Sequence, residues 1–237
     1  MSQVVLILPG ATDYELQGRI QGDLDIPLCE EGREEVQRVA RELQDLGLDV
    51  VYSSCCSSAA QTAEGIAKAL GIKTKKLDNL ENLDHGLWQG LLIDEVRQKQ
   101  PKVYRQWQEH PESCCPPEGE TIEHARGRVE GALAKLLKKH KDGVFGLVVP
   151  EPLASVVREY LGESELGDLW EATCEHGRWS LISVDAAAPG SGRAIAKSPD
   201  AAADERGAND HSGALQAEVG GVYSDVAAAA APQKLAQ

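Results

Sequence analysis

Apolar segments that are typical of strands alternate with amphipathic helices along the first 184 residues, and this order restricts the fold more than any other feature. Four segments rich in β-branched and apolar residues are expected to be strands: 4–8, 48–54, 143–149 and 178–184. Five segments are expected to be helical, the third of them as one helix or two: 30–47, 57–71, 92–110, 121–140 and 152–162. Strands and helices in this order form a mostly parallel sheet covered on both faces. We therefore predict a three-layer α/β/α domain over residues 1–184.

The composition changes after residue 184. Residues 185–237 are rich in Ala, Gly, Ser, Asp and Pro and contain few large apolar residues. A segment of this kind buries too little apolar surface to offset the entropy lost on ordering. The sequence predicts a low-complexity, disordered C-terminal tail.

The charge balance limits the classes of partner. The formal net charge is −14, and a field of this sign repels nucleic acid and anionic lipid. No apolar run approaches the roughly 20 residues of a membrane-spanning helix, and no basic secretory signal opens the chain. The six cysteines are then expected to remain free thiols in a reducing compartment. We expect a cytoplasmic protein that binds neither nucleic acid nor membrane.

Several motifs in a fixed order point to a known family. They are "GRIQGDLDIPLCEEG" after the first strand, "VVYSSCCSSAAQTAEGIA", "LENLDHGLWQGL" and "PPEGET". Their glycines, the Pro27-Leu28 turn and the Gln61-Thr62-Ala63 run resemble those of the histidine phosphatase superfamily, in the branch that includes cofactor-dependent phosphoglycerate mutase. The resemblance covers residues 4 to about 184 and implies the fold expected above.

The residues that perform the family's chemistry are replaced. By the resemblance, Pro9 stands at the position of the family's nucleophilic histidine and Leu8 at that of the neighbouring arginine. Ser58 stands at the position of the second arginine, Asn82 at that of the acid and Glu151 at that of the second histidine. None of these side chains can attack phosphorus, neutralise a phosphate or donate a proton near neutral pH as the family's residues do. The first hypothesis is therefore a pseudoenzyme, catalytically inactive and acting as a binding, scaffolding or regulatory module.

A second hypothesis is a divergent enzyme, or a phosphatase with non-standard residues, that uses the remodelled pocket. The pocket residues considered are Arg19, His85 and Glu151. His85 stands where the family has phenylalanine and is expected to be a partly exposed loop residue. His124 is expected on the solvated face of a helix.

The cysteines offer a further alternative. Cys55 and Cys56 would border the former phosphate pocket, and Cys114 and Cys115 lie in a loop that, by the resemblance, closes over it. Four thiols suit zinc, copper(I) or an iron–sulfur cluster, but adjacent cysteines lack the spacing that wraps one metal ion. We predict free thiols, with no metal and no cofactor.

The sequence leaves the partners open. The inactive-module hypothesis requires one or more protein partners, which the sequence does not identify. A third hypothesis is that the domain serves mainly to form a homodimer, with the tail as a tether.

Overall fold

A five-stranded sheet forms the centre of the molecule. The computed structural model describes residues 2–184, so the predicted tail at 185–237 lies outside the described residues. The strands are β1 (Ser2–Ile7), β2 (Val50–Ser53), β3 (Lys73–Lys76), β4 (Val144–Val148) and β5 (Trp179–Val184). Their order across the sheet is β3-β2-β4-β1-β5. All neighbours are parallel except β5, which is antiparallel to β1. The predicted mostly parallel α/β fold is confirmed.

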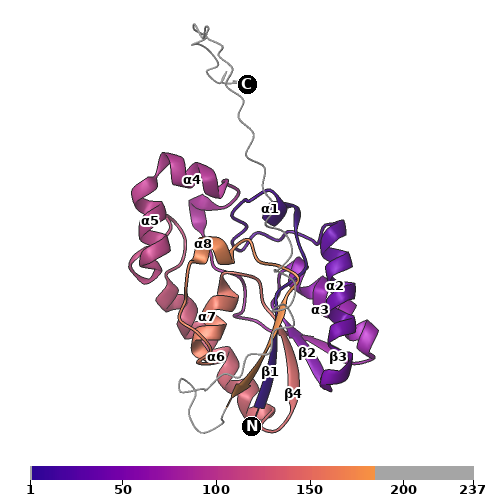
Figure 1. Cartoon of the computed structure of the whole chain (residues 1–237). Coiled ribbons are helices and arrows are strands. Elements are labelled where there is room, and N and C mark those ends of the chain that lie inside the picture. The colour runs from indigo at the N-terminus through magenta and orange to yellow at the C-terminus, as the bar shows by residue number, and fades with distance from the viewer. Residues whose placement is uncertain (1, 185–237) are drawn as a thin grey trace, which may run out of the picture. The chain divides into compact units, whose positions relative to one another are not determined.

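Helices cover both faces of this sheet (Figure 1). Alternate residues of β1 point to opposite faces, as strand geometry requires. Val4 and Leu6 join the core under α6 (Ile122–Lys139) and α7 (Leu153–Tyr160), whereas Val5 and Ile7 join the core under α2 (Glu30–Glu42) and α3 (Ser57–Leu70). These four residues of β1 are at most 1% exposed, so the apolar part of this interior strand is buried on both faces.

The predicted helices form with small shifts at their ends. The predicted helix at 30–47 ends as α2 at Glu42, followed by a 3-10 turn at Gln44–Leu46. The segment 92–110 gives two helices, α4 (Ile93–Lys99) and α5 (Pro101–Glu109), because proline is accommodated in the first turn of a helix but not in its interior. The short helices α1 (Asp13–Leu16) and α8 (Leu169–Ala172) were not predicted.

Strand β3 was also missed by the sequence analysis. Its sequence is KTKK and all four residues are exposed, so it carries neither a continuous apolar run nor an alternating pattern. Its position is set by pairing with β2 and by the end of α3 at Gly71, which adopts a left-handed conformation.

The helices of residues 2–184 include none that is both long and apolar enough to span a membrane.

Candidate functional site

The loop after β1 occupies the place where the family resemblance puts the nucleophile. Leu8 N donates to Arg178 O at 2.8 Å, and Pro9 O accepts from Gly177 N at 2.6 Å. Gly10 N donates to Thr62 Oγ1 at 3.1 Å and Ala11 N to Glu35 Oε2 at 2.9 Å. Every backbone amide of this loop that can donate is therefore bound within the protein. The amides are not free to hold a phosphate.

Two glycines explain why this loop keeps its shape although its side chains changed. A Cβ on Gly10 would lie 2.2 Å from Gly32 O, and a Cβ on Gly32 would lie 2.1 Å from Ala11 O. Both contacts are far too short for any side chain. The loop after β1 therefore rests directly on the start of α2, and this contact positions Glu35 one turn further along the helix.

Glu151 follows β4 and is buried, at 3% exposure. Its Oε2 accepts from Ser155 N at 3.0 Å and from Ser155 Oγ at 2.9 Å, and its Oε1 is paired with Arg158. Burial raises the pKa of Glu151, while Arg158 and Ser155 oppose that shift. The carboxylate thus forms a local ion pair at the start of α7 and does not present a free group to a substrate.

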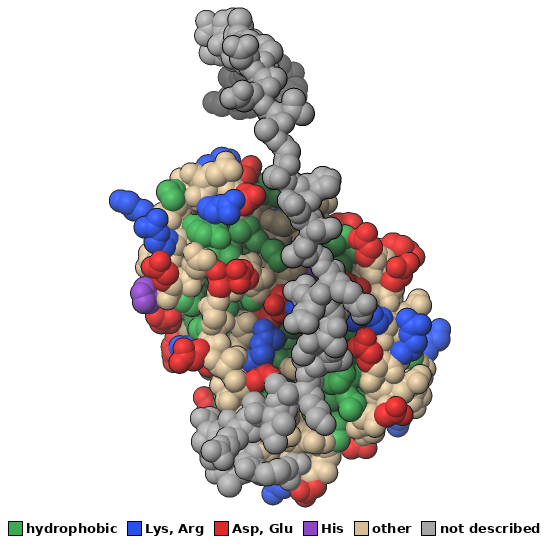
Figure 2. Space-filling view, viewed as in Figure 1, with side chains coloured by type: hydrophobic (Ala, Val, Ile, Leu, Met, Phe, Trp, Pro, Cys, Tyr) green, Lys and Arg blue, Asp and Glu red, His purple; other side chains and the backbone are tan. Residues whose placement is uncertain are grey.

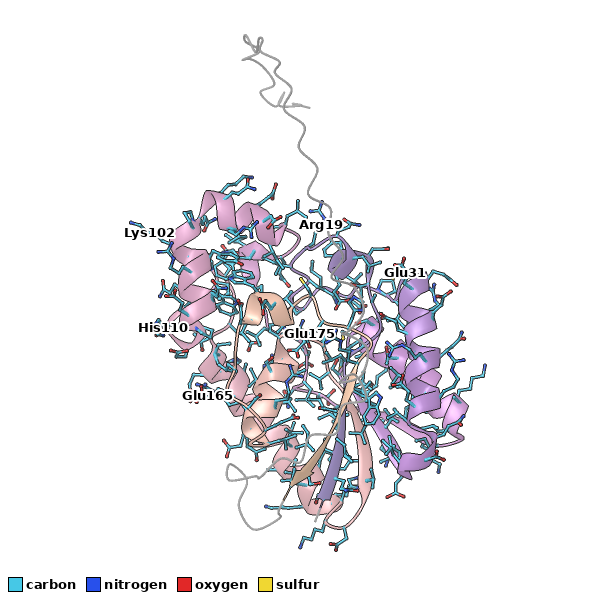
Figure 3. The ribbon with its side chains drawn as sticks, in the orientation of Figure 1. Arg19, Glu31, Lys102, His110, Glu165 and Glu175 are labelled. Atoms are coloured by element: carbon cyan, nitrogen blue, oxygen red, sulfur yellow. The ribbon has the colours of Figure 1, made fainter. Side chains whose placement is uncertain are left out.

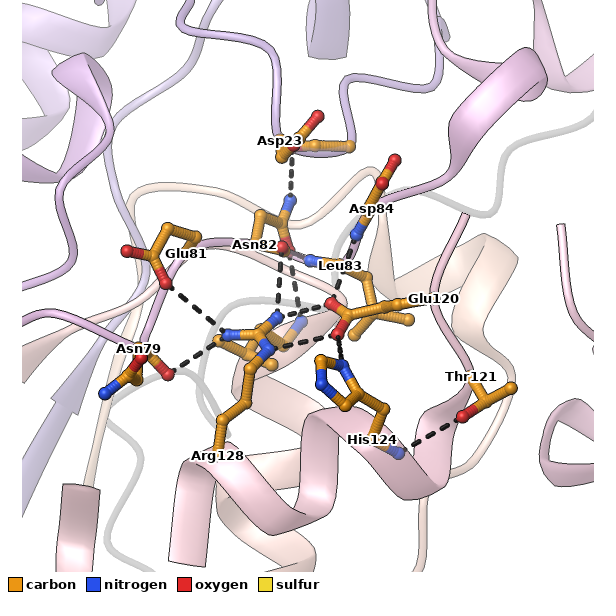
Figure 4. A network of polar contacts seen from close by, with 12 residues as sticks. Asp23, Asn79, Glu81, Asn82, Leu83, Asp84, Glu120, Thr121, His124 and Arg128 are labelled. Carbon is orange, nitrogen blue, oxygen red and sulfur yellow. Dashed lines mark hydrogen bonds and ion pairs between the residues drawn. The ribbon is translucent and has the colours of Figure 1, made fainter. Parts of the chain in front are cut away.

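Asn82, which the family resemblance places at the position of the acid, is held in a network of buried hydrogen bonds. Its Nδ2 donates to Gly22 O at 3.0 Å and to Glu151 O at 2.8 Å, and its Oδ1 accepts from Leu83 N at 2.9 Å and Leu153 N at 3.3 Å. The backbone of Asn82 is held in turn by Arg128, which is paired with Glu120 (Figure 4). Ser58 is likewise buried, with its Oγ 3.7 Å from Cys56 Sγ. Neither residue is free for chemistry.

His85 is fully buried, so the prediction of a partly exposed loop histidine is wrong. Its ring contacts those of Trp88 and Trp107, at centroid distances of 6.4 and 5.4 Å. Nδ1 lies 3.1 Å from Leu83 O, and Nε2 has no hydrogen-bond partner within the described residues. Burial lowers the pKa of His85 to about 4. The imidazole is therefore neutral near pH 7 and packs against the two tryptophan rings, as the phenylalanine expected from the family resemblance would.

The predicted pocket residues make no direct polar contact with one another within the described residues. Arg19 Nη1 donates to Gly90 O at 2.7 Å, and Figure 3 shows Arg19 beside α1. Within residues 2–184, no hydrogen bond or ion pair joins any two of Arg19, His85 and Glu151. His124 lies on the solvated face of α6, as predicted, with Nδ1 2.8 Å from Glu120 Oε2.

The two cysteine pairs have different neighbours. Cys55 Sγ contacts Leu77 O at 3.3 Å, whereas Cys115 Sγ contacts Pro116 O at 3.5 Å. All six cysteines are free thiols. In the described part of the chain, no three His, Cys, Asp or Glu side chains form a group that would hold a metal ion.

A histidine that the sequence analysis did not consider lies beside the former nucleophile position. His176 Nδ1 is 2.9 Å from Glu35 Oε1, and the imidazole is 24% exposed. The hydrogen bond to Glu35 raises the pKa of His176, while burial and, to a smaller extent, the charge of Arg178 act in the opposite direction. Gly177, between His176 and Arg178, is the residue whose amide is bound to Pro9 O. His176 and Arg178 are therefore the two neighbours of Gly177, which is hydrogen-bonded to Pro9. By the family resemblance, Leu8 and Pro9 stand where an arginine and a histidine are expected.

Glu15 completes this group. It closes a capping box with Thr12, whose backbone amide donates to Glu15 Oε2 at 2.7 Å. Burial raises the pKa of Glu15 to about 7, and the charges of His176 and Glu35 contribute smaller effects in opposite directions. Glu15 is partly exposed, and a carboxyl that keeps its proton near neutrality is typical of a general acid.

Comparison with known proteins establishes the family. The model of the histidine phosphatase superfamily, branch 1, matches residues 4–191. The chain belongs to this family. It is 31% identical over 186 residues to phosphoserine phosphatase 1 of Hydrogenobacter thermophilus, an alignment that covers 78% of this chain and 88% of that protein.

Solved structures of similar fold agree with this assignment. Bacillus stearothermophilus YhfR superimposes with a TM-score of 0.70 at 22% identity, over 83% of this chain and 96% of that one. A phosphoserine phosphatase variant from Entamoeba histolytica, in complex with phosphoserine, gives a TM-score of 0.65 at 22% identity, over 77% and 91% of the two chains. These similarities support the histidine phosphatase fold.

These relatives overturn the prediction that the chain is not an enzyme. A histidine phosphatase family model and a relative named as a phosphoserine phosphatase, 31% identical over 78% of the chain, point to an enzyme. The prediction rested on comparing side chains position by position along the chain. Such a comparison does not detect groups that the fold brings to the same place from distant segments, as it does with His176 and Arg178.

One sequence motif could have indicated that His176 and Arg178 are functional candidates. The segment "EHGR" at 175–178 contains the histidine, glycine and arginine that the family carries after its first strand, in a different order and next to the last strand instead. Only the pairing of β5 with β1 shows that the two places are neighbours.

Proposed function

We propose that this histidine phosphatase family member hydrolyses phosphate monoesters with His176 in place of the missing nucleophile. The observation that carries the proposal is the contact between His176 Nδ1 and Glu35, in a segment hydrogen-bonded to Pro9. The phosphatase names of the relatives support the reaction class.

The Glu35 contact prepares His176 for attack. A carboxylate that accepts from Nδ1 fixes the neutral tautomer in which Nε2 carries the lone pair, and because the same contact raises the pKa of His176, this nucleophilic form is populated at higher pH than in a free histidine. Glu35 is itself fixed, because it also accepts from Ala11 N. Nε2 of His176 has no hydrogen-bond or ion-pair partner among residues 2–184. The nucleophilic atom is thus available while the rest of the ring is held.

Two guanidinium groups lie near this histidine. Arg38 Nη2 donates to Gly177 O at 2.7 Å. Arg178 is exposed and forms no ion pair within the described residues. A phosphate dianion beside His176 would meet positive charge from Arg178, which is the role that the family's arginines perform.

The proposed reaction has two steps. The lone pair of Nε2 forms a bond to phosphorus while the P–O bond to the alcohol breaks, and the alcohol oxygen takes the proton of the neutral Glu15 carboxyl. Water then breaks the P–N bond, which releases phosphate and restores the imidazole, and Glu15 recovers a proton from that water. At the end of the second step, His176 and Glu15 have both returned to the protonation states in which they began.

The test is hydrolysis of p-nitrophenyl phosphate and phosphoserine by the full chain. We expect His176→Ala to lower kcat by at least about 100-fold, whereas His110→Ala should leave it unchanged. His110 is a suitable control because it is an exposed histidine beside an acidic residue, Glu112, at the end of α5 (Figure 3). Labelled substrate should also leave acid-labile phosphate on wild type but not on His176→Ala. Equal rates for the wild type and His176→Ala would overturn the proposal.

We also propose that the protein works in the cytoplasm. The support is chemical: all six cysteines are free thiols, three of them exposed, which suits a reducing compartment. Fractionation of cells that express a tagged chain tests this.

A further inference from the structure

The outer edge of β3 is an open hydrogen-bonding edge. β3 lies at one end of the sheet and pairs only with β2 within the described residues. Residues Lys73–Lys76 are all exposed. The backbone N–H and C=O groups that point away from β2 are therefore available to another extended segment, which is how peptides add to sheet edges.

Lysines gather beside this edge on the α6 side of the sheet. Lys75 is in register with Tyr52, so the two side chains share a face. Tyr52 Oη accepts from Lys139 Nζ at 3.0 Å and lies 2.9 Å from His140 Nε2. Lys73 shares the face of Lys75, and Lys135 lies one helical turn before Lys139. The set is defined here as the lysine edge: Lys73, Lys75, Lys135 and Lys139.

The lysine edge has little counter-charge. None of its four lysines forms a salt bridge with an acidic side chain in the described structure, although many of the protein's other charges are paired. Asp49 is the carboxylate near enough to His140 to oppose the effect of Lys75 and Lys139 on that ring. The chain as a whole carries −14, and acidic side chains are spread over the face shown in Figure 2. Most lysines among residues 2–184 also lack an ion pair, so what distinguishes the lysine edge is that four positive charges lie close together on an acidic protein.

We propose that the lysine edge binds an acidic, extended segment of a partner protein, which adds a strand to β3. The open backbone edge supplies main-chain hydrogen bonds, and the lysines supply charge complementarity to glutamate or aspartate side chains. Lysines on an open edge also prevent strands of other copies of the chain from pairing there, since like charges repel. An acidic strand is the partner that removes this repulsion.

The experiment measures binding of a fluorescein-labelled eight-residue peptide that alternates glutamate and threonine, by anisotropy, to the full chain. Peptide binding should weaken as the salt concentration is raised from about 50 to about 300 mM, because added salt screens the attraction between the lysines and the glutamates. Replacing every glutamate of the peptide with lysine should abolish it. A backbone N-methylated version should bind at least about tenfold more weakly, because it cannot pair with the strand edge.

Matched variants locate the site. Lys73→Glu with Lys75→Glu should weaken peptide binding by about tenfold or more. The control is Lys99→Glu with Lys102→Glu, which makes the same change in net charge at the exposed α4–α5 surface (Figure 3). Thermal unfolding of the Lys73 and Lys75 variant should match wild type because both lysines are exposed, and the control should lose at most the small stability of the exposed Lys99–Glu95 pair.

Three outcomes would overturn the proposal: equal weakening by both double variants, equal binding of the N-methylated peptide, or tighter binding of a single-stranded DNA 12-mer than of the acidic peptide. The last would assign the surface to a different polyanion. None of these measurements depends on phosphatase activity, so this inference stands or fails separately from the proposed function.

Discussion

Glu35 on α2 lies 2.9 Å from Nδ1 of His176, which is 141 residues away along the chain. Burial favours the neutral form of Glu35, but its hydrogen bonds with His176 and with the amide of Ala11 hold its pKa below the usual value. The same contact raises the pKa of His176. Each partner therefore stabilises the charged form of the other, and the contact joins α2 to the segment that precedes β5.

The first prediction concerns the pH dependence of this pair. Glu35 contributes stability above its unfolded pKa near 4.5, and His176 contributes it below its raised folded pKa. Their contribution is greatest between about pH 4.5 and 6.5 and is lost as pH rises through the folded pKa of His176. Glu35→Gln should cost about 1 kcal/mol at pH 6 and less at pH 9, measured by urea unfolding. A cost that grows with pH would contradict it. NMR titration should show a lower pKa for His176 in this variant.

Glu15→Gln should reduce the loss of unfolding free energy that occurs as the pH rises through neutrality. Because burial raises the folded pKa of Glu15 to about 7 from 4.5, the stability it contributes is complete below pH 4.5 and is lost as pH rises through 7. Glutamine keeps the capping box without ionising. The difference in unfolding free energy between the variant and wild type should increase in favour of the variant by about 2 kcal/mol as the pH rises from 4.5 to 8. Under the proposed mechanism its kcat should fall, because an amide cannot supply the proton.

Restoring the family's acid at position 82 should not restore its chemistry. Asn82→Glu would turn the donor that serves Gly22 O and Glu151 O into an acceptor facing two carbonyl oxygens. We expect a loss of about 3 kcal/mol in unfolding free energy and no gain in turnover. Gln98→Glu, the same kind of change at an exposed position of α4, should be neutral. A faster, stable Asn82→Glu enzyme would show that these hydrogen bonds are dispensable.

The ion pair at the start of α7 should be costly to break from one side. Arg158→Met leaves Glu151 buried without its cation and should cost about 3 kcal/mol in chemical denaturation. Adding Glu151→Gln should recover most of this loss. Arg97→Met, which breaks the exposed pair with Asp94, should cost less than about 1 kcal/mol. Equal losses in the two single variants would contradict a buried pair.

His85→Phe should stabilise the protein, most of all in acid. The buried Nε2 of His85 has no partner within the described residues, and burial lowers the pKa of His85 to about 4. Because protonation is disfavoured in the folded state, stability is lost as pH falls from 6.5 towards 4. Phenylalanine removes both costs, with an expected gain of about 1 kcal/mol at pH 7. Thermal unfolding at pH 5 and 7 checks whether the gain is larger at the lower pH.

The parts of this fold that the sequence predicted are those with strong local patterns. The apolar run at 4–8 and the amphipathic spacing at 121–140 indicated β1 and α6 within two residues of their bounds. Strand β3 was missed because KTKK is fully exposed and is placed by its neighbour β2. His85 was misjudged because burial in the aromatic cluster depends on Trp88 and Trp107, which approach only in the folded chain.

The sequence by itself determined the family, and its resemblance predicts that the family's residues are replaced at Pro9, Leu8 and Asn82. Hydrophobic period and glycine positions are local properties, so they can be read along the chain. Only the tertiary structure decided which groups stand beside Pro9. The antiparallel pairing of β5 with β1 brings His176 and Arg178 there, and α2 supplies Glu35. A site built from three distant segments exists only once the sheet has formed, because a contact between residues 141 positions apart depends on the fold and not on a local sequence pattern.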